Sequence, residues 1–134
     1  MERIKVSEYQ EQCDLIDWCF WNMRRWPELD LIHASANGAP LGGGKLGAMR
    51  MGMLKKSGLR PGIPDLFLPV ARGSFFGAYI EMKTKTGKLS ENQKEFIAAV
   101  EKQGYLCCVA YGAEEAIEFL ERYLQMPKTQ VVRE

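Results

Sequence analysis

The chain has 134 residues, of which 46% are hydrophobic and 26% charged, so we expect one soluble globular domain with a real core. No apolar run reaches the length of a membrane span, and residues 1–5 lack the apolar core of a signal peptide, which favours a cytoplasmic protein without a membrane partner. The four cysteines form no CxxC pair and His33 is the only histidine, which argues against a disulfide framework, a zinc site and a histidine-based nucleophile system.

The net charge of +1 hides an uneven distribution of charge along the chain. Residues 31–90 hold nine Lys or Arg and two acidic residues, a charge of +7, whereas the remainder carries −6. A basic segment fits a face that meets a polyanion, although a solvated helix face gives the same composition. The basic residues that we expect at a nucleic-acid-binding face are Lys45, Arg50, Lys55, Lys56, Arg60, Lys85 and Lys88.

The first predicted element is a helix over residues 7 to about 23–25. Ser7 and Gln10 form a capping-box pattern at its start. Apolar residues recur with helical spacing at Tyr9, Cys13, Ile16 and Phe20. Glu8 and Glu11 lie in the first turns, where the helix dipole favours negative charge, and Glu11 precedes Leu15 on a face that we expect to be partly buried.

A short strand, Leu31–Ala34, and a glycine-rich loop over residues 37–45 are expected next. The loop ends in Lys45 but is not a P-loop, because Ala39 stands where that motif needs Gly and Leu46 where it needs Ser or Thr. We therefore expect a mobile connection. The second predicted helix has a basic outer side, ends at residues 57–58, and has apolar positions at Leu46, Met49, Met53 and Leu54.

Two strands with turn residues between them, Pro61–Leu68 and Tyr79–Lys83, predict a β-hairpin. A turn centred on Gly73 places Asp65 opposite Glu81, with Cβ atoms roughly 4.5–5.5 Å apart. Two ionised carboxylates at that distance repel each other, so a divalent cation between them fits. Lys83 projects from the same strand face as Glu81, and Met82 points into the core.

An Asp, a Glu and a Lys that converge on a hard cation form a site for phosphodiester hydrolysis. The metal lowers the pKa of a bound water and draws charge from the phosphate oxygens. Lys83 could orient the attacking water or stabilise the developing negative charge. The alternative is a surface hairpin with ordinary charged residues.

The remaining pattern predicts a helix over residues 90–103, a buried strand over 105–110 and a last helix over 113–124. Because a helix separates them, the strand at 105–110 should run parallel to the strand that carries Glu81. Gln93 fits a capping box with Ser90, and near a metal its amide could also hold a water or a phosphate oxygen.

The element order α-β-α-β-β-α-β-α, with Gly62-Ile63-Pro64-Asp65, Glu81-Met82-Lys83 and Leu89-Ser90-Glu91-Asn92-Gln93, resembles the VRR-NUC branch of the PD-(D/E)xK nuclease superfamily. More narrowly, it is similar to the small stand-alone members of phages and bacteria. The resemblance runs from residue 11 to about residue 124. It implies an α/β fold with a restriction-endonuclease-like mixed β-sheet flanked by helices, and residues 1–125 as a single nuclease domain. From their terminal position we expect residues 126–134 to be a loosely held C-terminal tail.

The resemblance implies a structure-selective DNA endonuclease of the Holliday-junction resolvase type, a homodimer that uses Mg²⁺ or Mn²⁺ in a bacterial or phage-infected cell. The metal ligands that it implies are Asp65, Glu81, the Met82 carbonyl and Glu11. Glu8 competes with Glu11 for the helical position. Lys83 becomes the catalytic lysine and Gln93 the helix glutamine, beside the catalytic carboxylates. The alternatives are a non-catalytic DNA-binding module on the same fold and a structural or regulatory protein whose hairpin charges are incidental.

Overall fold

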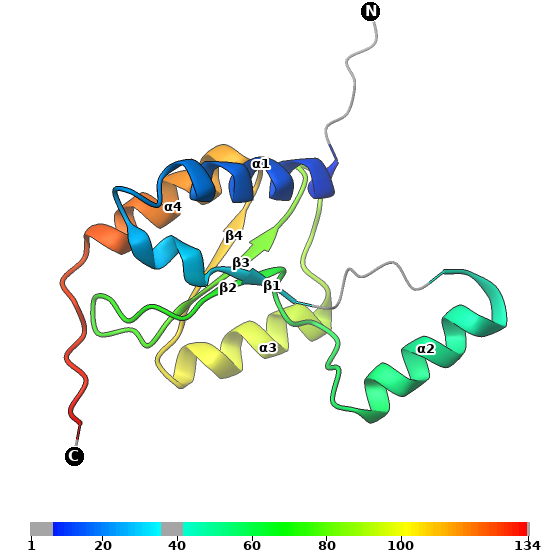
Figure 1. Ribbon diagram of the computed structural model, residues 1–134. Helices are drawn as coiled ribbons and strands as arrows, with labels where there is room; N and C mark the ends of the chain where they lie inside the picture. The colour runs from blue at the N-terminus through cyan, green and yellow to red at the C-terminus, as the bar shows by residue number, and fades with distance from the viewer. Residues whose placement is uncertain (1–6, 36–41, 134) are drawn as a thin grey trace, which may run out of the picture.

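A computed structural model describes residues 7–35 and 42–133, in which helices cover both faces of one β-sheet (Figure 1). Helices α1 and α4 lie on one face and α3 on the other. The elements in chain order are α1 (Glu8–Trp21), the 3₁₀ helix η1 (Pro27–Leu31), β1 (His33–Ala34), α2 (Gly44–Lys56), β2 (Leu66–Leu68), β3 (Ala78–Met82), α3 (Glu91–Lys102), β4 (Leu106–Ala110) and α4 (Ala113–Gln125). This order, with a 3₁₀ helix added, confirms the predicted mixed α/β class. None of the helices within the described ranges is long and apolar enough to span a membrane.

The sheet has the strand order β1-β2-β3-β4. β2 pairs antiparallel with β1 and β3, and β4 pairs parallel with β3 after the α3 crossover, as the sequence predicted. β1 is shorter than the predicted strand, because residues 27–31 form η1 instead. The glycine-rich loop prediction falls mostly on residues 36–41, which lie outside the described ranges.

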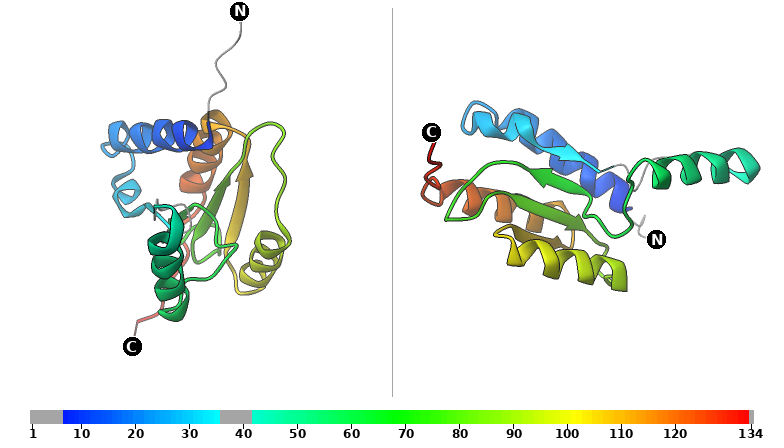
Figure 2. Two further views of the ribbon diagram at one scale, coloured as in Figure 1. Left: turned by 90° about the vertical axis from the view of Figure 1, so that its right-hand side faces the viewer. Right: turned by 90° about the horizontal axis from the view of Figure 1, so that it is seen from below.

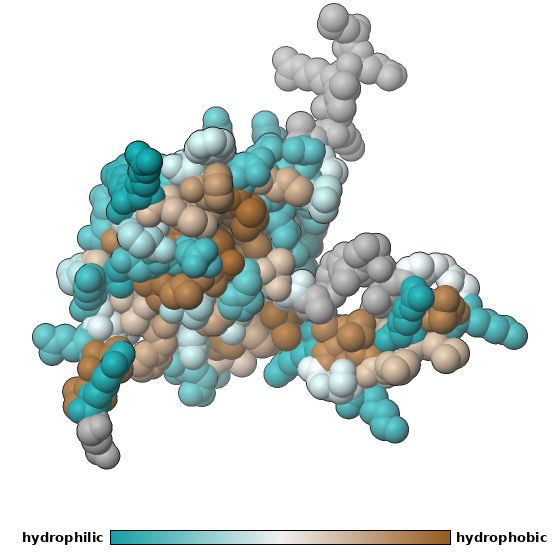
Figure 3. All heavy atoms as spheres, in the orientation of Figure 1, coloured by the Kyte–Doolittle hydropathy of each residue, from teal (hydrophilic) through white to brown (hydrophobic). Residues whose placement is uncertain are grey.

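Helix α2 stands apart from these layers and extends from one side of the molecule (Figure 2). Gly47 is its only buried residue, and apolar spheres lie on its surface (Figure 3). The prediction that its apolar side faces the core is therefore wrong. In α1 the apolar stripe that predicted the helix is also not the buried one, because the buried residues are Leu15 and Cys19. Helical spacing located both helices but did not identify their inner faces.

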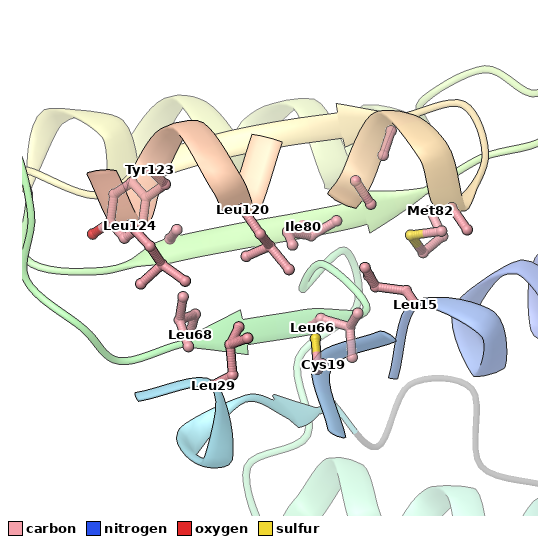
Figure 4. Packing of buried hydrophobic residues seen from close by; sticks show 14 of the residues in the cluster. Leu15, Cys19, Leu29, Leu66, Leu68, Ile80, Met82, Leu120, Tyr123 and Leu124 are labelled. Atoms are coloured by element: carbon pink, nitrogen blue, oxygen red, sulfur yellow. The ribbon is translucent and has the colours of Figure 1, made fainter. Parts of the chain in front are cut away.

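The core lies between the sheet and the layer of α1 and α4 (Figure 4). Alternate residues of the central strands point to this side, and all are almost fully buried: Leu66, Leu68, Ala78, Ile80 and Met82. They meet Leu15 and Cys19 of α1 and Leu120 and Leu124 of α4. The expectation that Met82 faces the core is confirmed, and its neighbours Glu81 and Lys83 consequently face the α3 side.

The hairpin register agrees with the prediction although the turn does not. Leu66 pairs with Ile80, so the next opposed positions are Asp65 and Glu81. The turn is centred between Gly73 and Ser74, both with positive φ, and not on Gly73. A tight turn at Pro69, in which the Val70 N–H donates to the Leu68 carbonyl at 2.9 Å, gives the first arm an extra residue. The turn centre lies half a residue later than predicted, and the extra residue in the first arm compensates for this shift. The predicted register between the two strands is therefore preserved.

The segment after α4 is held more firmly than a loose tail. The Gly73 N–H donates to the Pro127 carbonyl at 2.7 Å, and the Thr129 hydroxyl donates to the Phe75 carbonyl at 3.0 Å. Residues 127–129 thus run beside the hairpin turn, and the predicted boundary at residue 125 marks the end of a helix and not the end of ordered packing.

Candidate active site

Asp65 is held where β2 begins by backbone contacts to both neighbouring strands. Its carbonyl accepts the Ser35 N–H at 2.8 Å, which extends the pairing with β1. Its carboxylate oxygen Oδ2 accepts the N–H of Met82 in β3, also at 2.8 Å. The backbone therefore fixes the Asp65 carboxylate beside the residue that follows Glu81.

Glu81 is a buried acid with one oxygen bonded and one oxygen unpartnered. The side chain is on the α3 face of β3, and the residue is 3% exposed. Oε1 accepts a hydrogen bond from Gln93 Nε2 at 3.1 Å and lies 3.8 Å from the Lys83 ammonium. Oε2 is buried and has no hydrogen-bond partner. An unpartnered buried carboxylate oxygen is costly unless a ligand or a proton completes it.

Burial raises the pKa of Glu81 from its ordinary value of 4.5 to about 8, and the neighbouring Asp65 carboxylate adds to the shift. The Lys83 ammonium opposes this shift but is too weak to reverse it. The two carboxylates therefore share a site that does not accept two negative charges without a counterion. The direction of this pKa shift agrees with the expectation that two neighbouring carboxylates disfavour each other's charge.

The side-chain amide of Gln93 takes part in both the N-terminal cap of α3 and the acidic pair. Its Oε1 accepts the Ser90 N–H at 2.9 Å, and the Ser90 hydroxyl accepts the Gln93 N–H, which completes the predicted capping box. Its Nε2 then points to Glu81. Gly62 allows this approach of α3, because a Cβ there would lie 2.5 Å from the Asn92 backbone. The capping-box interpretation of Gln93 is thus confirmed, its amide also contacts Glu81, and a contact with a water or a phosphate oxygen stays a prediction.

Glu11 lies at the end of the sheet, across a pocket from Lys83. Its carboxylate accepts the Ala113 N–H at 2.6 Å and so caps the start of α4. The pocket has a volume of about 420 Å³ and is lined by Glu11, Lys83, Thr84, Lys85, Thr86, Tyr111 and Gly112. Glu8 is exposed and is not among the lining residues. Of the two candidate acids, Glu11 therefore lines the pocket that contains Lys83, and Glu8 does not.

The acids form a pair and not a triad. Nowhere in residues 7–35 and 42–133 do three Asp, Glu, His or Cys side chains gather closely enough to hold one metal ion. The structure therefore brings Asp65 and Glu81 together with Lys83 and Gln93, but it does not bring Glu11 to the same point. Lys83 is the residue that joins the carboxylate pair to the pocket.

The pair nevertheless suits a small hard cation. Mg²⁺ typically binds one or two carboxylates and completes its shell with waters and substrate phosphate. The orphaned Oε2 of Glu81 is a donor of the right kind. The Met82 N–H points to Asp65, and in an extended strand the carbonyl of the same residue leaves on the same edge, so the Met82 carbonyl faces this side too.

The predicted basic residues fall into two groups. Lys85 and Lys88 are exposed in the loop between β3 and α3, and Lys85 lines the pocket. The others precede the hairpin: Lys45, Arg50, Lys55 and Lys56 are exposed on α2, and the exposed Arg60 places its guanidinium 5.4 Å from the Phe96 ring centre of α3. Of these residues, only Lys85 lines the pocket that Lys83 joins to the acidic pair.

Sequence reasoning missed the far wall of the pocket. Tyr111 is 40% exposed and follows β4 directly, and Thr84 and Thr86 follow β3. The available signal was that β3 and β4 were predicted to be parallel neighbours, because the residues after two such strands meet at one edge of the sheet.

Comparison with known proteins finds a family model and a solved structure that this chain resembles. The family described as VRR-NUC domain matches residues 4–114. A solved structure titled "VRR_NUC domain protein" superposes with a TM-score of 0.76 at 25% sequence identity, covering 96% of this chain and 100% of that one. No curated protein sequence matches significantly.

Proposed function

The chain belongs to the VRR-NUC domain family, and on this premise we propose that it is a metal-dependent DNA endonuclease. It is a nuclease-type domain, for which DNA is the substrate. The observation that carries the metal requirement is the buried Oε2 of Glu81, without a hydrogen-bond partner and beside a second carboxylate. We assign Mg²⁺ or Mn²⁺ to this position and place the chain in the PD-(D/E)xK superfamily.

The residues that would hold the ion are Asp65, Glu81 and the Met82 carbonyl, and Glu11, which lines the pocket beside Lys83, is the helical acid that we propose as a further ligand. A bound divalent ion would lower the pKa of a water and withdraw charge from the phosphate. Gln93 holds Oε1 of Glu81 and so leaves Oε2 for the ion. This contact orients the Glu81 carboxylate before any ligand binds.

Lys83 supplies the positive charge beside the reacting groups. Its ammonium lies 3.8 Å from Glu81 and lines the pocket, with its side chain mostly buried. From there it can orient the attacking water or stabilise the negative charge that develops on the phosphate. Lys85 lines the pocket, Lys88 is exposed in the same loop, and both would hold neighbouring DNA phosphates.

We propose branched DNA of the Holliday-junction type as the substrate, cut by a homodimer of the kind found in phages and bacteria. Two symmetric cuts need two symmetric sites, which a two-fold dimer supplies. The uneven charge of the chain supports a polyanionic substrate, since residues 31–90 carry +7.

The test is cleavage of junction, flap, splayed, single-stranded and linear DNA with Mg²⁺ or Mn²⁺ and with a chelator. We expect metal-dependent cleavage by the wild type, and a loss of about 100- to 1,000-fold in Asp65→Ala and Lys83→Ala. Lys102→Ala is the matched control, because Lys102 is exposed at the end of α3 remote from Gln93. Equal cleavage by all four proteins would reject the site. Salt-sensitive DNA binding without cutting would support the non-catalytic module, and binding of neither Mn²⁺ nor DNA would support a structural or regulatory role.

A further inference from the structure

Helix α2 carries an apolar stripe that nothing in the described chain covers. Leu46, Met49 and Met53 are 55%, 63% and 68% exposed. They are spaced three and four residues apart, so they form one row along the helix. The helix extends away from the sheet and packs against no other described element over any length (Figures 1 and 2). An exposed row of large apolar residues on an extended helix marks an interaction surface.

Helix α1 carries a second uncovered apolar stripe on its outward side. Tyr9, Ile16 and Phe20 are 77%, 37% and 63% exposed, with the half-buried Cys13 between them. The opposite side of the helix already packs on the core through Leu15 and Cys19. The outward stripe is therefore additional to the apolar surface that the fold itself needs.

The two helices have opposite charge. α1 contains four acids, Glu8, Glu11, Asp14 and Asp17, and no basic residue. α2 contains four bases, Lys45, Arg50, Lys55 and Lys56, and no acid. Each stripe is thus bordered by charges of one sign, and the signs are complementary. Such borders favour the pairing of unlike stripes and disfavour the pairing of like ones.

We propose that the stripe of α2 docks on the outward stripe of α1 in a second copy of this chain. This inference rests on the homodimer of the proposed function and names its surface. At a rise of 1.5 Å per residue, the α2 stripe spans about 10 Å and the α1 stripe about 16 Å, so the first fits within the second. Asp14 and Asp17, which directly follow Cys13 and Ile16 along one edge of the α1 stripe, would meet the bases beside Met49 and Met53.

A two-fold axis makes this contact twice. Each chain offers one acidic and one basic stripe, so α2 of each copy covers α1 of the other and the assembly closes at two chains. Lys55 is nine residues beyond Leu46 and hence on the opposite side of α2, where it stays available to DNA phosphates.

The experiment is a charge exchange read out by molar mass. One variant carries Asp14→Lys and Asp17→Lys on α1, and the other carries Arg50→Glu and Lys56→Glu on α2. We expect the wild type at about twice the chain mass of 15.2 kDa and each variant alone at the mass of one chain. Because mixing the two variants restores both contacts with reversed signs in one of them, we expect the mixture to return to the dimer mass.

Two controls keep the test decisive. Glu114→Lys and Lys102→Glu, exposed charge reversals on α4 and α3, should leave the dimer unchanged. Met49→Ser with Met53→Ser removes the apolar row without changing charge and should give one-chain mass with an unchanged circular dichroism spectrum. This second variant decides the matter if a charge-reversed chain does not fold.

A wild type of one-chain mass would overturn the inference, whether α2 binds DNA alone or folds onto α1 of its own chain. So would variants that remain dimers, or a mixture that remains monomeric. The mass is measured without DNA or metal and is therefore independent of the cleavage assay. A protein that is monomeric but cuts DNA would contradict the proposed dimer surface and leave the proposed activity intact. A charge-paired dimer that cuts no DNA overturns the proposed activity and keeps the surface.

Discussion

Replacing Glu81 by Gln should make the metal-free protein more stable at neutral pH. The folded state holds this acid with its pKa raised from 4.5 to about 8, mainly by burial. Between these two values the folded chain binds more protons than the unfolded chain, so stability falls as pH rises through the window. At pH 7 the cost is about 3 kcal/mol, and below pH 4.5 it vanishes because both states are protonated. Glutamine mimics the protonated acid and escapes this cost.

The assay is urea denaturation of wild type and Glu81→Gln in a chelator at pH 5, 6, 7 and 8. We expect the variant to gain on the wild type by roughly 1 kcal/mol per pH unit, with equal m-values. Added Mn²⁺ should stabilise the wild type and not the variant. Glu118→Gln, an exposed acid of α4, is the control and should follow the wild-type slope. A variant less stable than the wild type at pH 8, or a constant difference across pH, would refute the reasoning.

Two further predictions concern the neighbours of the pair. Ser90→Ala and Gln93→Ala should each cost about 1 kcal/mol in denaturation, because both remove part of the capping box, but only Gln93→Ala should also slow cleavage, by about tenfold. An equal loss of cleavage in both would assign the effect to the cap. Lys85→Glu and Lys88→Glu should each weaken DNA binding and reduce its salt dependence by about one phosphate contact. Lys102→Glu should change neither, and an unchanged salt slope in the loop variants would remove that loop from the interface.

The acidic pair was predictable because its causes are local. Alternation along a strand places Glu81 and Lys83 on one face, and the composition of residues 72–74 announces a turn between the strands. The predicted centre on Gly73 was half a residue early, and the extra residue near Pro69 compensated for it. A register derived from a turn is thus sensitive to irregularities that the sequence pattern does not reveal.

The surroundings of the pair were not predictable because their causes are not local. The contact between Glu11 and Ala113 joins residues 102 positions apart, and it depends on how α1 crosses the end of α4. The inner face of α1 likewise follows from what packs against it. Tyr9, Ile16 and Phe20 form the more apolar stripe, yet the sheet and α4 meet Leu15 and Cys19. Apolar spacing alone does not distinguish a core face from a docking face.

The unfavourable burial of Glu81 affects only one face of β3. The opposite face of the strand packs in the hydrophobic core and stabilises the fold. Ile80 and Met82 are buried beneath α1 and α4, on either side of Glu81 in sequence. Because side chains alternate, the same strand that packs the core must present Glu81 to α3, where it lacks a partner for Oε2. A neutral side chain at Glu81 would relieve that cost and lose the ligand. Because the buried Glu81 carboxylate destabilises the folded chain on its own, the binding of a cation would offset that cost and so stabilise the fold.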